Sequence, residues 1–176
     1  MKILTGILVL LWVVLISCSN ETTEKPINNQ ENVTTTYYLI RHAEKDRSNP
    51  DNENPELNEE GFARAQNWAS ILSDIDLDFI YASNYKRTQQ TALPISKSKN
   101  IQVESYDPHK VYETNFFEKT EGKQILVVGH SNTVPAFVNH VLGEERYKNI
   151  PDSIDGRLYI VTKMGNQSKS LILNLE

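Results

Sequence analysis

Short apolar runs recur along the chain and alternate with segments in which apolar residues return every three or four positions. A continuous run of roughly four to eight β-branched and aromatic residues is typical of a buried strand, whereas the wider spacing is typical of a helix with one buried face. The pattern predicts the order βαβαβαβα followed by two strands, which pair as a hairpin around a Gly-Asn turn. The predicted strands lie at about 37–40, 79–82, 102–105, 125–128, 158–162 and 171–175.

Helix signals fill the intervals between these strands. Asn58 can cap the start of one helix, because an amide oxygen at this position accepts a hydrogen bond from the first turn. Phe62 and Trp68 are assigned to the core, since both lie on the apolar side of that helix. That side comprises Phe62, Ala65, Trp68, Ala69 and Leu72. Further helices are expected at about 85–99, at 111–120 and from 133 onward.

An alternation of strands and helices with short links is typical of a mostly parallel sheet covered on both faces. The sequence therefore predicts an α/β fold, a three-layer α/β/α sandwich. By size, residues 37–176 form one domain, and the sequence contains no visible internal repeat.

Chemistry-bearing side chains follow three of the predicted strands. Arg41 and His42 come directly after the first strand, Arg87 follows the second, and His130 comes after the fourth. In an open α/β sheet, residues just past the carboxyl ends of neighbouring strands meet in one crevice. We therefore expect these four side chains to line one pocket.

Two arginines and two histidines suit a compact dianion, because guanidinium groups stay charged and match phosphate oxygens in pairs. A neutral histidine can attack phosphorus and split hydrolysis into two steps through a phosphohistidine, while the other donates hydrogen bonds to the transferring group. No metal or other cofactor is required, because the arginines supply the charge neutralisation that magnesium supplies elsewhere. The four residues predict metal-independent phosphoryl chemistry.

Four segments, taken together and in this order, resemble the signatures of the histidine phosphatase superfamily, which has the phosphoglycerate-mutase-like fold. The resemblance runs from about Tyr37 to the C-terminus. The segments are Leu-Ile-Arg-His-Ala-Glu-Lys at 39–45, Leu-Asn-Glu-Glu-Gly at 57–61, Tyr-Ala-Ser-Asn-Tyr-Lys-Arg-Thr-Gln-Gln-Thr-Ala at 81–92 and Val-Val-Gly-His-Ser-Asn-Thr at 127–133.

The resemblance implies a role for each matching residue. His42 matches the phosphorylated histidine, Arg41 and Arg87 match the two arginines that clamp phosphate, and His130 matches the second histidine of the pocket. Glu44 belongs to the first signature and is interpreted as a positioning residue.

A carboxylic acid often protonates the leaving group in this family, from the segment between the second arginine and the second histidine. Here the candidate proton donors are Asp107 and Glu113, although the surrounding residues do not reproduce the family's acid motif. His109 and His140 are interpreted as surface or helix-face residues.

The expected function is phosphomonoester hydrolysis through a phosphohistidine on His42, acting on a phosphorylated small molecule or a phosphoprotein. Mutase-type phosphoryl transfer and non-catalytic binding of phosphorylated ligands are the alternatives. Loops at 46–57 and 107–117 are expected to cover the pocket and set specificity, with Arg47 and Asn49 as candidate substrate contacts.

The N-terminus predicts export. Lys2 precedes an apolar stretch from Ile3 to Ile16, which is shorter than the about twenty residues that a membrane span needs. This is typical of a signal peptide over 1–17. Leu-Ile-Ser-Cys at 15–18 resembles a bacterial lipobox, in which the cysteine becomes lipidated, and Cys18 is the only cysteine of the chain. We expect an exported bacterial lipoprotein anchored to a membrane of the cell envelope.

The segment 18–36 is rich in Asn, Thr, Glu and Gln and has almost no large apolar residues, so it is expected to be a disordered tether. The formal net charge of the chain is −5 at pH 7, and no basic stripe is visible. A nucleic-acid partner is therefore not expected.

Overall fold

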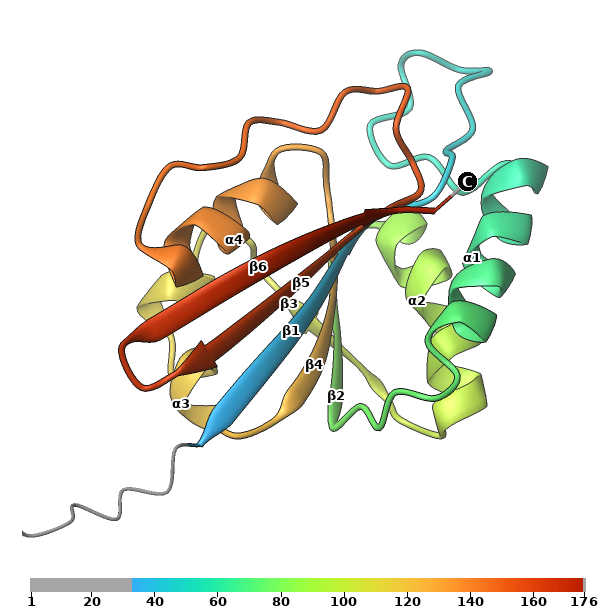
Figure 1. Ribbon diagram of the computed structural model, residues 1–176. Helices are drawn as coiled ribbons and strands as arrows, with labels where there is room; N and C mark the ends of the chain where they lie inside the picture. Colours follow the sequence, from blue (N-terminus) through green and yellow to red (C-terminus); the bar gives the residue numbers. More distant parts are fainter. Residues whose placement is uncertain (1–32, 176) are drawn as a thin grey trace, which may run out of the picture.

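One six-stranded sheet forms the centre of the computed structural model, which describes residues 33–175 (Figure 1). The strand order across the sheet is β3-β2-β4-β1-β5-β6. The strands are β1 (Thr34–Arg41), β2 (Phe79–Ser83), β3 (Val103–Tyr106), β4 (Gln124–Gly129), β5 (Arg157–Met164) and β6 (Gln167–Asn174).

The sheet is parallel from β3 through β2 and β4 to β1, and β5 and β6 add an antiparallel edge. The predicted hairpin is confirmed, because Met164 pairs with Gln167 and Gly165 has φ +55° in the turn between them. β4 is buried along nearly all of its length, as expected for a parallel strand with helices on both faces.

Helices cover both faces of the sheet, so the predicted three-layer arrangement is confirmed (Figure 1). One layer contains α1 (Glu59–Ile71) and α2 (Lys86–Lys99), and the other contains α3 (Phe116–Lys119) and α4 (Thr133–Leu142). Adjacent residues of a strand point to opposite faces. Accordingly, Leu39 packs in the core beneath α3 and α4, whereas Ile40 packs in the core beneath α1 and α2.

Asn58 caps α1 as predicted, since its side-chain oxygen accepts a hydrogen bond from the Gly61 amide at 2.8 Å. Trp68 is buried in the core, as expected. The assignment of Phe62 to the core is wrong, because its side chain is 46% exposed. The buried stripe of α1 runs through Gly61, Ala65 and Trp68, and Phe62 lies one position off that stripe.

The predicted helix at 111–120 is also wrong. The segment consists of a 3₁₀ turn, η1 (Val111–Glu113), and the single turn α3 (Phe116–Lys119). Thr114 is extended and interrupts the helix, and its hydroxyl donates to the Val111 carbonyl at 2.9 Å.

The sheet begins earlier than the predicted domain boundary. β1 starts at Thr34, and the buried Thr35 hydroxyl accepts a hydrogen bond from the Gly122 amide at 2.8 Å. Residues 34–36 therefore belong to the sheet and not to the tether. The predicted signal peptide and Cys18 lie outside the described residues. Within 33–175, no helix is long and apolar enough to cross a membrane.

Candidate active site

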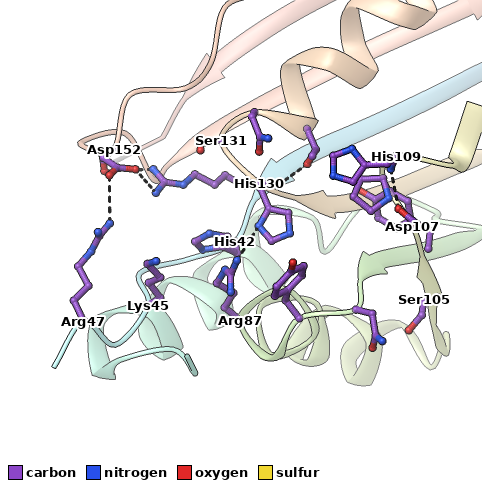
Figure 2. A pocket seen from close by; sticks show the side chains of 17 residues that line it. His42, Lys45, Arg47, Arg87, Ser105, Asp107, His109, His130, Ser131 and Asp152 are labelled. Atoms are coloured by element: carbon purple, nitrogen blue, oxygen red, sulfur yellow. Dashed lines mark hydrogen bonds and ion pairs between the residues drawn. The ribbon is translucent and has the colours of Figure 1, made fainter. Parts of the chain in front are cut away.

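The four predicted site residues line one cleft of about 880 Å³ at the carboxyl ends of the parallel strands (Figure 2). Arg41 is the last residue of β1, His42 and His130 directly follow β1 and β4, and Arg87 lies in the first turn of α2, just beyond β2. The His42 and His130 rings meet edge to face, with centroids 5.4 Å apart. The structure thus brings together every residue of the predicted quartet.

The register between β1 and β4 sets this proximity. Arg41 pairs with Gly129 across the two strands, and the His42 amide donates to the Gly129 carbonyl at 2.9 Å. A Cβ at Gly129 would lie 2.9 Å from the Thr133 hydroxyl and 3.0 Å from the Tyr106 hydroxyl. Glycine at this position therefore allows the strand end and the start of α4 to approach closely.

His42 is held in one tautomer. Its Nδ1 lies 2.8 Å from the Ala43 carbonyl, which can only accept, so Nδ1 carries the proton and Nε2 carries the lone pair. Burial, together with the charges of His130, Arg87 and Arg41, lowers the pKa of His42 to about 3, although the hydrogen bond to the Ala43 carbonyl acts in the opposite direction. At neutral pH, His42 is an uncharged imidazole with an unprotonated Nε2.

His130 is oriented by a chain of buried hydroxyls. The Thr88 hydroxyl donates to the carbonyls of Ser83 and Tyr85 at 2.7 and 2.8 Å. The Ser83 hydroxyl must therefore donate to Thr88, at 3.0 Å, and accept from His130 Nε2, at 2.8 Å. The proton of His130 resides on Nε2, which leaves Nδ1 as an acceptor.

The opposite side of the His130 ring agrees with this assignment. Its Nδ1 lies 3.5 Å from Nη2 of Arg87, a group that can only donate. Burial, followed by the charges of Arg87 and Arg41, lowers the pKa of His130 to about 4. Sequence reasoning missed the roles of Ser83 and Thr88, although both lie within the segment 81–92.

Arg87 presents buried donors without partners. Its Nε and Nη1 atoms are buried and make no hydrogen bond among the described residues. The guanidinium stacks over the Tyr85 ring, 4.4 Å from its centroid, which fixes its plane. A buried donor left unpaired costs about 1–3 kcal/mol. An oxyanion in the cleft would satisfy these donors.

Arg41 is held by the segment that precedes β5. Its Nη2 lies 3.0 Å from a carboxylate oxygen of Asp152, and its Nη1 lies 3.3 Å from one of Asp155. Its Nε is buried without a partner in the described part of the chain. No local pattern in the sequence indicates Asp152 or Asp155, which lie more than a hundred residues from Arg41.

Comparison with known proteins agrees with this geometry. The sequence profile of the histidine phosphatase superfamily (branch 1) matches residues 37–108. An alignment over 70 residues is 43% identical to phosphoserine phosphatase 1 from Hydrogenobacter thermophilus and covers 37% of this chain and 33% of that protein. The chain thus matches about a third of the length of this curated relative. Residues 37–108, which include Arg41, His42 and Arg87, thus carry the sequence signature of the histidine phosphatase superfamily (branch 1).

Solved structures show the same fold. The α-ribazole phosphatase from Shigella flexneri superposes with a TM-score of 0.63 and 15% identity, covering 80% of this chain and 96% of that one. The protein histidine phosphatase SixA in complex with tungstate gives the same TM-score and identity, covering 79% and 96%. The residues that match the superfamily profile include Arg41, His42 and Arg87. His130 lies beyond the matched range and is brought into the site by the pairing of β4 with β1.

Of the superfamily-type proton-donor candidates, only Asp107 lines the cleft. Glu113 lies on the exposed surface of η1, and the structure does not bring it into the cleft lining. His109 also lines the cleft, at its exposed rim, whereas His140 lies on α4 and packs against Tyr112 with centroids 4.2 Å apart.

Glu44 joins the first signature to α1, in agreement with a positioning role. Its carboxylate accepts from Arg64 Nε at 2.6 Å, and its carbonyl accepts from the Asn58 amide at 3.0 Å. A Cβ at Gly61 would lie 2.1 Å from that carbonyl oxygen. The glycine of the segment 57–61 is therefore needed for α1 to approach the chain next to His42.

Proposed function

We propose that this protein hydrolyses phosphomonoesters through a phosphohistidine formed on Nε2 of His42. The observation that carries the proposal is the fixed tautomer of His42 beside the unpaired, buried donors of Arg87. The first supplies a nitrogen lone pair at neutral pH, and the second supplies a binding site for phosphoryl oxygens.

The proposed reaction has two displacements. Nε2 of His42 attacks phosphorus, the phosphorus–oxygen bond of the ester breaks, and the leaving oxygen takes a proton from Asp107 or from water. Water then attacks phosphorus, the phosphorus–nitrogen bond breaks, one proton of the water returns to the group that protonated the leaving oxygen, and inorganic phosphate leaves with His42 neutral again. Arg41 and Arg87 bind the nonbridging oxygens in both steps, and no metal ion is required.

His130 changes its protonation when substrate binds. Its Nδ1 accepts from Arg87 in the free protein and has no proton to donate. A phosphoryl dianion close to Nδ1 favours the protonated ring, which can then donate to a phosphoryl oxygen. We therefore expect substrate binding to take up a proton from solvent or from the monoanionic ester.

The names of the relatives indicate two kinds of substrate. Phosphoserine phosphatase 1 and α-ribazole phosphatase are named for small phosphate esters, and SixA is a protein histidine phosphatase that binds tungstate in its solved complex. We propose a phosphorylated small molecule or a phosphoprotein as the substrate of this chain.

The test is phosphate release from an aryl phosphate by the full chain, with His42→Ala as the control. We expect turnover by the wild-type protein, loss of turnover in His42→Ala, and a phosphohistidine that is stable to base and labile to acid. Retention of activity by a folded His42→Ala protein would contradict the assignment. Binding without turnover would indicate a ligand-binding lipoprotein, and transfer of the phosphoryl group to a second hydroxyl would indicate a mutase.

We further propose that the chain is exported and anchored to a membrane of the bacterial cell envelope through lipid on Cys18. The support is the sequence at 1–18, which lies outside the described residues. Labelling with radioactive palmitate in the bacterial host tests it, and Cys18→Ser should release the protein from the membrane fraction. Labelling of the Cys18→Ser protein would refute lipidation at this residue.

A further inference from the structure

Lys45 is a half-buried cation that lacks a partner. Its side chain lines the active-site cleft and makes no hydrogen bond or ion pair among the described residues. Burial lowers its pKa, and the nearby charges of Arg87, Arg47 and Arg41 lower it further, against the smaller opposing effect of Asp152. A cation placed among other cations in a cleft is stabilised most simply by a bound anion.

Arg47 lies beside Lys45 on the same wall of the cleft. Figure 2 shows both side chains on one side of His42, with Asp107 and His109 on the other. The side chain of Arg47 is 60% exposed, and the distance between its Nη2 and the Asp152 carboxylate is long for an ion pair, at 3.7 Å. It can reorient toward a ligand at little cost.

The backbone that carries the two cations is held at both ends of its loop. Lys45 pairs with Leu57 in an isolated β-bridge, and the Asp46 amide donates to the Glu56 carbonyl at 2.8 Å. The loop is therefore anchored next to the nucleophile, and the position of Lys45 does not depend on its exposed tip.

No carboxylate of the cleft forms an ion pair with Lys45 in the described part of the chain. Asp152 pairs with Arg41 and Arg47, and Asp107 accepts from the His109 amide at 2.9 Å. The reacting phosphoryl group has its own donors in Arg41, Arg87 and His130. A cleft of about 880 Å³ also holds much more than a phosphoryl group, since such a volume suits a whole drug-sized ligand.

We propose that Lys45 and Arg47 form a subsite for a second anionic group, a carboxylate or a second phosphate, carried by the leaving group of the substrate. This inference rests on the proposed phosphatase function and narrows its substrate class to doubly anionic phosphomonoesters. Lys45 supplies the fixed charge of the subsite. The exposed Arg47 side chain reorients from the edge of the cleft to contact the bound anion.

Binding to the inactive His42→Ala full chain tests the subsite independently of turnover. The probes are 3-carboxyphenyl phosphate and its neutral counterpart 3-carbamoylphenyl phosphate, which differ in one charge, with 1,3-phenylene bisphosphate as the second anion type. Calorimetry gives the ratio of dissociation constants within each protein. We expect the carboxylate or the bisphosphate to bind about tenfold more tightly than the carbamoyl ester, the size of one hydrogen bond between charged groups.

Substitutions then assign the preference to residues. Lys45→Met in the His42→Ala background should bring the ratio close to one, and Lys45→Arg should retain it. Lys110→Met is the matched control, because this lysine is exposed and lies outside the cleft lining. Arg47→Met should lower the ratio by a smaller factor.

Two results would overturn the subsite: equal binding of the charged and neutral esters, or a ratio that Lys45→Met leaves intact. The latter would place Lys45 on the reacting phosphoryl group, where it affects both esters equally. The proposed function is judged separately, by turnover of either ester in the wild-type protein.

Discussion

The hydroxyl chain behind His130 makes a sharp prediction for Ser83→Ala. The substitution removes the acceptor of His130 Nε2–H and leaves the Thr88 hydroxyl without its donor. Ser83 and Thr88 are fully buried, so water cannot replace the missing oxygen without rearrangement. An unpaired buried donor costs about 1–3 kcal/mol. For a domain of this size, that lowers the melting temperature by roughly 2–10 °C.

The same substitution should change the chemistry. Without Ser83, His130 is free to place its proton on Nδ1, and its ring loses the contact that orients it. We expect kcat/KM for an aryl phosphate to fall about tenfold, which corresponds to about 1.4 kcal/mol of lost transition-state stabilisation. Long-range ¹H–¹⁵N spectra of His130 should show the Nε2–H tautomer in the wild-type protein and a mixture in Ser83→Ala.

Ser98→Ala is the matched control, because the Ser98 hydroxyl also donates a hydrogen bond, to the Ile95 carbonyl at 2.9 Å, but Ser98 is exposed. It should leave the spectra of His130 unchanged. An Nδ1–H tautomer in the wild-type protein, or a Ser83→Ala enzyme within twofold of wild-type kcat/KM, would refute the hydroxyl chain as the element that orients His130.

Three further predictions concern the surroundings of the site. Folding lowers the pKa of His42 from its ordinary value of 6.5 to about 3, so between these pH values the unfolded chain binds a proton that the folded protein does not. The free energy of unfolding should therefore decrease as the pH falls from 6.5 toward 3, and it should decrease less steeply in His42→Ala. Equal pH slopes of the two proteins in urea titrations would contradict this. Asp152→Asn removes a carboxylate that competes with bound phosphate for Arg41, so inorganic phosphate should bind several-fold more tightly in calorimetry. Unchanged or weaker binding would argue against this competition. Gly61→Ala places a methyl group 2.1 Å from the Glu44 carbonyl oxygen and should lower the free energy of unfolding in urea by about 1–3 kcal/mol. An unchanged free energy of unfolding would contradict this close approach.

The sequence predicts the parts of this molecule that depend on local pattern. Arg41, His42 and His130 follow short apolar runs that are typical of buried strands, and their meeting at one sheet edge follows from the topology. The three-layer fold follows in the same way from the alternation of strand and helix signals. Trp68 lies on the buried stripe of α1, as predicted. The predicted apolar face is wider than the observed buried stripe, because it includes the exposed Phe62.

The remainder depends on contacts between distant residues. Asp152 and Asp155 approach Arg41 only because of the path of the segment before β5, and no local spacing indicates that path. The break at Thr114 arises from a side-chain bond that competes with the helix. The isolation of Lys45 can be recognised only once the partners of every neighbouring carboxylate are known.

The pairing of Arg41 with Gly129 has a consequence for how this protein can vary over evolution. A slip of one residue between β1 and β4 would turn every side chain of the moved strand to the opposite layer and carry His42 away from His130. Insertions and deletions inside these two strands are thus incompatible with the chemistry. The exposed part of the loop between Asp46 and Glu56 lies outside the paired strands and can change length, so new substrates can be acquired without disturbing the nucleophile.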